Sequence, residues 1–208
     1  MVPHTIGLIL AGGQARRMGG VDKAFIEVGG KPLLEHAIAR ARPQVSDLLI
    51  SANGDPSRFA RFGFPVLADR VQGFLGPLAG ILTGLEWMRA NRPDARWLAS
   101  FACDCPFFPT NMVERLVKMA IERRTRITMA ASAGRHHPVF AVWSAEISDT
   151  AESVLVQAGY RKMDDWIADF THRRLIFGAR PFDPFFNINT PDDVARAESL
   201  LAAQATIR

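Results

Sequence analysis

The sequence is poor in cysteine and contains no long apolar run, and each shortage excludes a class of protein. Its 208 residues include only two cysteines, Cys103 and Cys105. Cysteines this close along the chain close a disulfide badly, and two thiols alone make a poor zinc site. We therefore expect free thiols in a reducing compartment.

Membrane insertion and secretion are not expected either. No apolar run approaches the roughly 20 residues that span a bilayer. Residues 1–5 also lack the basic region and the cleavable apolar stretch of a secretory signal. These absences predict a cytoplasmic protein without a membrane partner.

Lysine is scarce as well. Only four of the 25 basic residues are lysines, and the net charge is +4. The arginines are scattered, and their one dense cluster, at 122–126, closes a predicted helix where cations suit the dipole. Nucleic-acid binders instead concentrate their basic residues in stripes. The balance favours small polyanionic substrates over DNA or RNA.

Apolar and helical patterns alternate along most of the chain. At 48% hydrophobic residues, the sequence predicts a full core and a single domain over 1–208. The expected strands are 6–10, 47–52, 65–67, 97–102, 126–131 and 139–143, and the expected helices are 32–41, 78–90, 110–123, 144–157 and 191–203. Thr110 and Thr190 are predicted N-caps. This alternation predicts a Rossmann-like, doubly wound α/β fold with a mainly parallel sheet and helices on both faces. A strand over 137–143 that runs against the others, and a further short strand at 173–177, make the sheet mixed.

The most informative segment is 8–23, where an apolar strand breaks into a glycine-rich basic loop. The loop holds Gly12, Gly13, Gly19, Gly20, Arg16, Arg17 and Lys23. Glycines let backbone N–H groups approach an anion, and the cations supply charge for phosphate oxygens. Neither a Walker motif nor Gly-x-Gly-x-x-Gly is present, so the pattern predicts another kind of triphosphate cradle. A glycine-rich turn with exposed arginines is the alternative.

Asp104 is the candidate metal ligand. The apolar strand 97–102 delivers it to the carboxyl edge of the sheet, and Pro106 stops the strand. A carboxylate that faces a triphosphate suits Mg²⁺, which takes one or two carboxylates and fills its shell with phosphate and water. The alternative is an aspartate that caps the turn through backbone N–H groups.

Further polar residues follow the other strands. Ser51, Asn53 and Asp69 stand at predicted strand ends, where they either contact a nucleoside or serve as turn residues. His137 is a phosphate donor or a loop histidine. Asn187 and Asn189 lie two residues apart, so on a strand they project to one side.

In combination these motifs resemble the molybdenum cofactor guanylyltransferase family. The resemblance is carried, in order from Ile6 to Asp193, by Leu10-Ala-Gly-Gly13, Arg17-Met-Gly-Gly20, Asp22-Lys23, Gly76-Pro-Leu-Ala-Gly80, Asp104-x-Pro106, His137-Pro138 and Asn187-Ile-Asn189-Thr190-Pro191. It implies a Mg²⁺-dependent enzyme that transfers GMP from GTP to molybdopterin-bound cofactor and releases pyrophosphate. It places Leu10, Ala11, Gly12, Gly13 and Lys23 on GTP, Asp69 on the nucleoside side and Asp104 on Mg²⁺. It places Arg17, Gly20, Arg161, Asn187 and Asn189 on the pterin substrate. Lys23, Arg17 and Asp104 are the expected catalytic residues.

One departure concerns Ser51, where the family often has Asn. A hydroxyl keeps only part of an amide's hydrogen bonding, so Asn53 is a candidate replacement. The alternatives are a CTP-dependent relative acting on the same cofactor or on a sugar or polyol phosphate, and a non-catalytic GTP-binding regulator. The cytidylyl relatives usually carry Leu-Ala-Ala-Gly where this chain has Gly12. We expect a monomer that contacts cofactor-synthesis proteins and molybdoenzymes only transiently.

Overall fold

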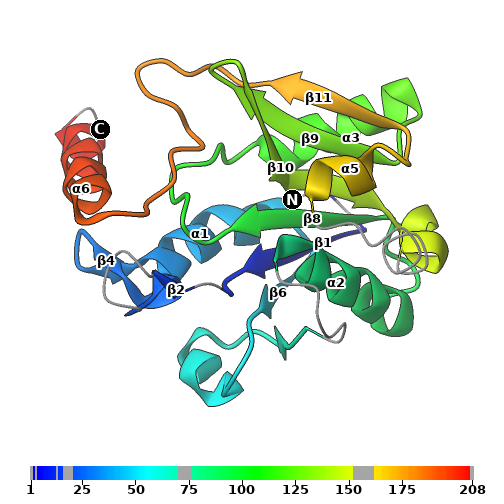
Figure 1. Ribbon diagram of the computed structural model, residues 1–208, viewed down its shortest axis with the longest axis horizontal. Helices are drawn as coiled ribbons and strands as arrows, with labels where there is room; N and C mark the ends of the chain where they lie inside the picture. The colour runs from blue at the N-terminus through cyan, green and yellow to red at the C-terminus, as the bar shows by residue number, and fades with distance from the viewer. Residues whose placement is uncertain are drawn as a thin grey trace.

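A seven-stranded mixed sheet forms the centre of the molecule (Figure 1). The computed structural model describes residues 2, 4–12, 14–15, 21–69, 76–151 and 162–206. The sheet order is β11-β9-β10-β8-β1-β6-β7. Its strands are, in chain order, β1 (Thr5–Leu10), β6 (Asp47–Ser51), β7 (Val66–Leu67), β8 (Trp97–Ala102), β9 (Ile127–Ser132), β10 (Arg135–Ser144) and β11 (His172–Ile176).

Within this sheet β10 alone runs against its neighbours. It pairs antiparallel with β8 and β9, whereas β1 pairs parallel with β6 and β8, β6 with β7, and β9 with β11. The register between β9 and β10 shifts between His137 and Ala141, where Pro138 has no N–H to donate. The carboxyl ends of β1, β6 and β8 therefore meet at one edge, which is where open α/β sheets bind ligands.

Helices cover both faces of the sheet because the strands alternate their apolar side chains. One face of β1 presents Ile9 to a cluster shared with α1 (Leu33–Ala41) and α3 (Met112–Arg123). The other face presents Ile6 and Leu8 to a cluster shared with α2 (Pro77–Asn91) and α5 (Met163–Ile167). These clusters confirm the expected doubly wound fold. No described helix is long and apolar enough to cross a bilayer.

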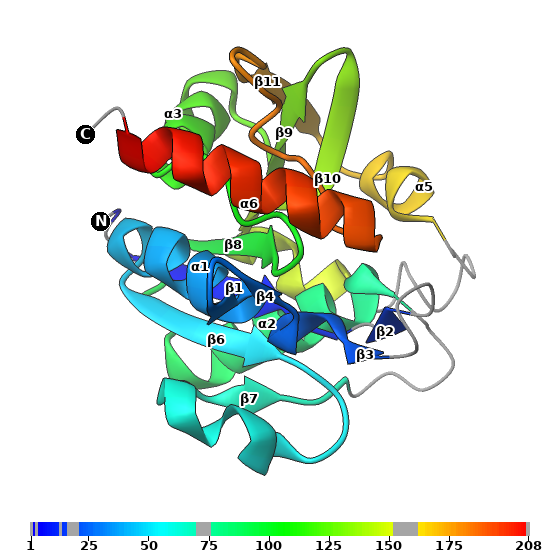
Figure 2. The same ribbon diagram turned by 90° about the vertical axis from the view of Figure 1, so that its left-hand side faces the viewer.

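Shorter elements surround the carboxyl edge. Two small hairpins, β2 (Gln14–Ala15) with β3 (Val21–Asp22) and β4 (Glu27–Val28) with β5 (Lys31–Pro32), flank the 3₁₀ turn η2 (Lys23–Phe25). The 3₁₀ helix η4 (Pro56–Phe62) joins β6 to β7. The C-terminal helix α6 (Pro191–Thr206) stands apart from the other helices, beside β4 (Figures 1 and 2). Two further 3₁₀ turns in the described residues are η3 (Arg42–Gln44) and η5 (Ala145–Ile147).

Two predicted helix starts are wrong. Helix α3 begins at Met112, with Asn111 as N-cap in place of Thr110, because Gln44 Oε1 accepts the buried N–H of Val113 at 2.9 Å. Ser144 is the last residue of β10, and its Oγ accepts the N–H of Glu146 at 3.2 Å to cap η5. The predicted cap at Thr190 is confirmed, since Asp193 N–H donates to its Oγ1 at 3.2 Å.

Candidate active site at the carboxyl edge of the sheet

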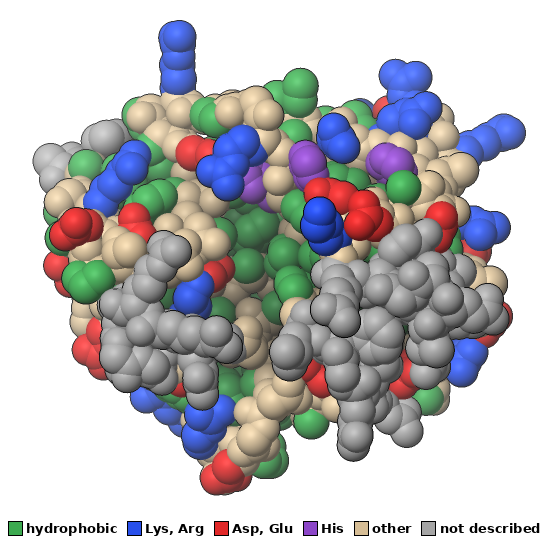
Figure 3. Space-filling model, viewed as in Figure 1, with side chains coloured by type: hydrophobic (Ala, Val, Ile, Leu, Met, Phe, Trp, Pro, Cys, Tyr) green, Lys and Arg blue, Asp and Glu red, His purple; other side chains and the backbone are tan. Residues whose placement is uncertain are grey.

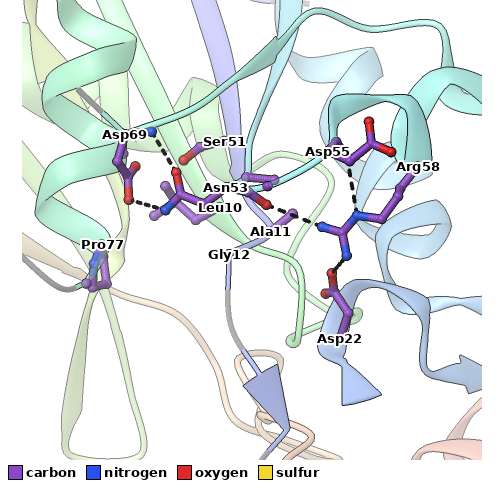
Figure 4. Close-up of a pocket in the computed structure, with 14 residues that line it drawn as sticks. Leu10, Ala11, Gly12, Asp22, Ser51, Asn53, Asp55, Arg58, Asp69 and Pro77 are labelled. Carbon is purple, nitrogen blue, oxygen red and sulfur yellow. Dashed lines mark hydrogen bonds and ion pairs between the residues drawn. The ribbon is translucent and has the colours of Figure 1, made fainter. Parts of the chain in front are cut away.

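A cavity of about 800 Å³ opens at the carboxyl ends of β1 and β6, beside the first turn of α2. The face of the molecule in Figure 3 is hollowed near its middle, with hydrophobic side chains on the floor of the hollow. The lining residues are Leu10, Ala11, Gly12, Asp22, Ser51, Ala52, Asn53, Gly54, Asp55, Arg58, Asp69, Gly76, Pro77 and Gly80 (Figure 4). The cavity therefore contains five predicted nucleotide residues from the ends of β1 and β6 together with Asp69. The five are Leu10, Ala11, Gly12, Ser51 and Asn53.

The floor of the cavity is tightly packed. A Cβ at Gly80 would lie 2.5 Å from Ser51 Oγ and 2.6 Å from Leu10 Cδ2, so only glycine lets α2 approach the strand ends this closely. Ser51 is buried here, with 5% of its surface exposed. By contrast, a Cβ at Gly12 would meet no atom of the described protein within 4 Å, because it faces open space. The N-terminus of α2 places a positive dipole end beside this space.

One wall of the cavity is held by a reciprocal pair between Asn53 and Asp69. Asn53 Nδ2 donates to Asp69 Oδ2, and the Asp69 backbone N–H donates to Asn53 Oδ1, both at 2.8 Å (Figure 4). Both ends of the Asn53 amide are thus engaged by Asp69. One Nδ2 hydrogen is left for another acceptor, so the role of Asn53 as a replacement for the family amide at position 51 stays a prediction.

The opposite wall carries an ion pair that the sequence did not reveal. Arg58 Nη1 lies 3.0 Å from Asp22 Oδ2, and Arg58 also donates to the backbone carbonyl oxygens of Asn53 and Asp55, each at 3.3 Å (Figure 4). Arg58 belongs to η4, which Asp55 caps through a 2.9 Å bond from Ser57 N–H. The Asp-Pro-Ser start was a visible cap signal, but no sequence motif marked Arg58.

Lys23 joins two distant parts of the predicted site. Its Nζ donates to Asp104 Oδ2 at 2.8 Å and to Asn189 Oδ1 at 2.5 Å. The Lys23 and Asp104 side chains are only 19% and 14% exposed. Burial strengthens such a pair compared with one in open solvent. The structure therefore brings together the predicted metal ligand, the predicted catalytic lysine and one of the two predicted pterin amides.

Hydrogen bonds also hold Asn189, which contacts Lys23, and Cys105, which contacts Asp104. The N–H groups of Asn189 and Thr190 each donate to Asp193 Oδ2 at 2.9 Å. Burial works to raise the pKa of Asp193, but these hydrogen bonds hold it below its ordinary value. Cys105 Sγ donates weakly to Asp104 Oδ1 at 3.7 Å and to the Phe185 carbonyl at 3.6 Å.

The two cysteines are free, as predicted, and both are buried. Burial raises the pKa of both thiols well above the ordinary value, and the negative charge of Asp104 adds to the effect. The thiols are therefore protonated and unreactive, and Cys105 acts as a hydrogen-bond donor.

The other predicted residues fall into two groups. Asn187 is exposed, on a segment without strand structure, and is not seen beside Lys23. His137 is committed to structure: its Nε2 lies 2.7 Å from Ser132 Oγ, which donates to Asp183 Oδ1 at 2.6 Å. Burial lowers the pKa of His137, which favours the neutral ring. Gly13, Arg16, Arg17, Gly19, Gly20 and Arg161 lie outside the described residues.

These features indicate a class of nucleotide-binding protein. A cavity at the edge of parallel strands, bordered by a helix N-terminus and with a lysine–carboxylate pair beside it, is suited to nucleoside triphosphates. Residues 7–173 match the family model of the MobA-like NTP transferase domain. In fold, the chain is similar to molybdopterin-guanine dinucleotide biosynthesis protein A from Archaeoglobus fulgidus. The TM-score is 0.74 at 24% identity, over 95% of this chain and 99% of that one. A CMP:2-keto-3-deoxy-manno-octonic acid synthetase complexed with CTP has a TM-score of 0.70 at 14% identity, over 96% of this chain and 99% of that one.

Closer relatives define the family. The chain is 48% identical to the molybdenum cofactor guanylyltransferase of Rhodopseudomonas palustris, over 95% of this chain and 94% of the relative. It is 47% identical to that of Mesorhizobium japonicum, over 96% and 97% of the two chains. The chain belongs to the molybdenum cofactor guanylyltransferase family.

Proposed function

We propose that this protein transfers GMP from GTP to the terminal phosphate of molybdenum-bound molybdopterin and releases pyrophosphate. The observation that carries the proposal is the contact of Lys23 with both Asp104 and Asn189 beside the cavity. One lysine there adjoins the residues that the family resemblance assigns to the nucleotide and to the acceptor. Family membership, at 45–48% identity over nearly the whole chain, supports the same reaction.

The cavity is the nucleotide subsite. Leu10, Ala11 and Gly12 line it where β1 ends, and the open space beside Gly12 leaves room for a purine. Asp69, held by Asn53, offers a carboxylate to ribose hydroxyls or a base edge. Ser51 contributes one hydroxyl at the floor in place of the amide common in the family. We assign Gly13 to the nucleotide on the family resemblance.

The acceptor subsite lies on the Asn189 side of Lys23. Asn189 is fixed by Asp193 and is the amide that reaches the lysine. We assign Arg17, Gly20, Arg161 and Asn187 to this subsite on the family resemblance. Arg17 is also the proposed partner of Lys23 in catalysis.

The chemistry requires charge neutralisation rather than proton transfer. The acceptor phosphate is already an anionic nucleophile, so no general base is needed. Negative charge grows on the departing pyrophosphate, and a fixed ammonium group at Lys23 stabilises it there.

We further propose that Asp104 holds Mg²⁺. Among the described residues no three His, Cys, Asp or Glu side chains gather into a metal cluster. A single carboxylate beside a triphosphate nevertheless fits Mg²⁺, which completes its shell with phosphate oxygens and water. The bound ion would neutralise phosphate charge and orient the leaving group.

The setting follows from the same features. We propose the cytoplasm as the compartment, since both thiols are free. We propose that residues 1–208 act as one domain and as a monomer.

Pyrophosphate release tests the proposal. Each of the four nucleoside triphosphates is assayed with and without molybdopterin-bound cofactor. We expect release with GTP only when the acceptor is present. Release with CTP alone among the four would support the cytidylyl alternative. Tight GTP binding without release would support a non-catalytic regulator.

A further inference from the structure

We propose that Arg58 is a positioning residue for Lys23 and acts through the carboxylate of Asp22. The inference rests on the proposed function of Lys23 and extends it to η4, a segment that carries none of the family motifs. Arg58 and Asp22 lie 36 positions apart, and their ion pair spans the wall of the cavity (Figure 4).

Asp22 sets the start of the turn that contains Lys23. It is the N-cap of η2, and its Oδ1 accepts the N–H of Ala24 at 3.1 Å. Its other oxygen, Oδ2, accepts from Arg58 at 3.0 Å. Both carboxylate oxygens are thus committed, one to the turn and one to η4. Movement of Asp22 would rotate the turn and displace the Lys23 side chain from Asp104.

Arg58 is itself well anchored. It donates to the carbonyl oxygens of Asn53 and Asp55, and its guanidinium lies 5.8 Å from the Phe25 ring centre and 5.2 Å from that of Phe59. The Phe25 and Phe59 rings are 5.3 Å apart. The Arg58 side chain therefore connects the Asn53–Asp69 wall to Asp22, the N-cap of η2, and to Phe25, its last residue, and Lys23 lies between these two residues in the chain.

A competing interpretation is that Arg58 binds substrate directly. It lines the cavity, its side chain is 41% exposed, and guanidinium groups are good phosphate donors. The two interpretations differ in what Asp22 does. If Arg58 positions Lys23, Asp22 is needed for the effect. If Arg58 binds phosphate, Asp22 competes with the substrate for the guanidinium.

The sequence offers a matched control in Arg61. This residue also belongs to η4, and its guanidinium lies 5.9 Å from the Phe25 ring centre, nearly the same distance as that of Arg58. It makes no ion pair with Asp22 in the part of the chain that the structure describes. Arg61→Ala therefore removes a stacked arginine from the same helix and leaves the link to Lys23 in place.

The test is a double-mutant cycle on GMP transfer. We expect Arg58→Ala and Asp22→Asn each to lower kcat about 3- to 10-fold, as for a partly exposed ion pair, with KM for GTP changed less. The double variant falls no further, and Arg58→Lys recovers part of the loss because an ammonium pairs with Asp22 but lacks the planar fork. Arg61→Ala keeps the wild-type kcat.

Three kinetic outcomes would overturn the inference. They are a rise in KM alone for Arg58→Ala with Asp22→Asn neutral or improved, additive losses in the double variant, and an equal loss in Arg61→Ala. The first would identify Arg58 as a phosphate ligand, and the last would indicate general loosening of η4.

A second measurement separates this inference from the proposed reaction. Amide hydrogen exchange at Ala24 reports the Asp22 cap without any turnover. We expect exchange there to accelerate about 3- to 10-fold in Arg58→Ala and to stay unchanged in Arg61→Ala. If the wild type transfers no GMP, the proposed function fails and this result still decides the link. Unchanged exchange at Ala24 in Arg58→Ala would refute the link itself.

Discussion

Replacing Gly80 by alanine tests whether the cavity floor is a substrate surface. The added methyl group would lie 2.5 Å from Ser51 Oγ and 2.6 Å from Leu10 Cδ2, so both side chains must move. Overpacking of this kind costs about 1–3 kcal/mol. Alanine within a helix returns about 1 kcal/mol relative to glycine. The free energy of unfolding should therefore fall by only about 0–2 kcal/mol, or about 0–8 °C in Tm.

Binding should respond more strongly than stability. The displaced Ser51 and Leu10 side chains enter the space assigned to the nucleoside, and a misfit of 1–3 kcal/mol corresponds to a GTP affinity weaker by about 5- to 150-fold. Gly84 is the matched control, one turn further along α2. A Cβ there would lie 2.8 Å from Leu8 Cδ2 in the core, but Gly84 does not line the cavity.

Isothermal titration with GTP and thermal unfolding give the two readouts for Gly80→Ala and Gly84→Ala. We expect similar losses of Tm and a loss of GTP affinity confined to Gly80→Ala. Gly12→Ala completes the set, because its methyl group would face open space. It should keep the wild-type Tm and still raise KM for GTP. Equal GTP affinity in Gly80→Ala and Gly84→Ala would refute the assignment of this floor to the nucleotide.

Three further predictions concern the lysine–carboxylate pair and His137. Lys23→Ala should lower kcat more than it raises KM for GTP, and Lys23→Arg should recover part of the loss. In steady-state kinetics, a rise in KM at constant kcat would contradict this prediction. Asp104→Asn should reduce turnover by orders of magnitude with a near-wild-type Tm, and near-normal turnover at saturating Mg²⁺ would exclude Asp104 as the metal ligand. Burial lowers the pKa of His137 below its ordinary 6.5, so the folded state binds fewer protons than the unfolded state. Its contribution to stability is therefore complete above pH 6.5 and is lost as pH falls towards the folded pKa. The Tm of His137→Gln should decline less than that of the wild type between pH 7 and 5, and parallel curves would contradict this.

The sequence was sufficient for the parts of the molecule that local patterns control. The apolar runs of β1, β6 and β8 predict the parallel core, and their carboxyl ends predict the edge where Lys23 and Asp104 meet. The Thr190-Pro-Asp-Asp193 pattern likewise predicts the start of α6, because a capping residue bonds within its own turn.

Sequence patterns missed the features in which a residue far along the chain supplies a hydrogen bond or an ion pair. The start of α3 is set by Gln44, which lies 69 positions from the Val113 N–H that it accepts. The contact of Asn53 with Asp69 was likewise not predicted, because parallel pairing of β6 with β7 brings together two residues that lie 16 positions apart. Periodicity and motif spacing contain no information about such pairings. Arg58 escaped notice for the same reason.

The fate of the α-phosphorus of GTP tests the central claim most directly. GTP labelled at that phosphorus is incubated with the protein, Mg²⁺ and molybdenum-bound molybdopterin, and the products are separated. The account predicts that the label moves into the pterin product in step with pyrophosphate release, and that Lys23→Ala slows both equally. Label recovered as free GMP, or retained in GTP that stays bound, would contradict transfer to the cofactor.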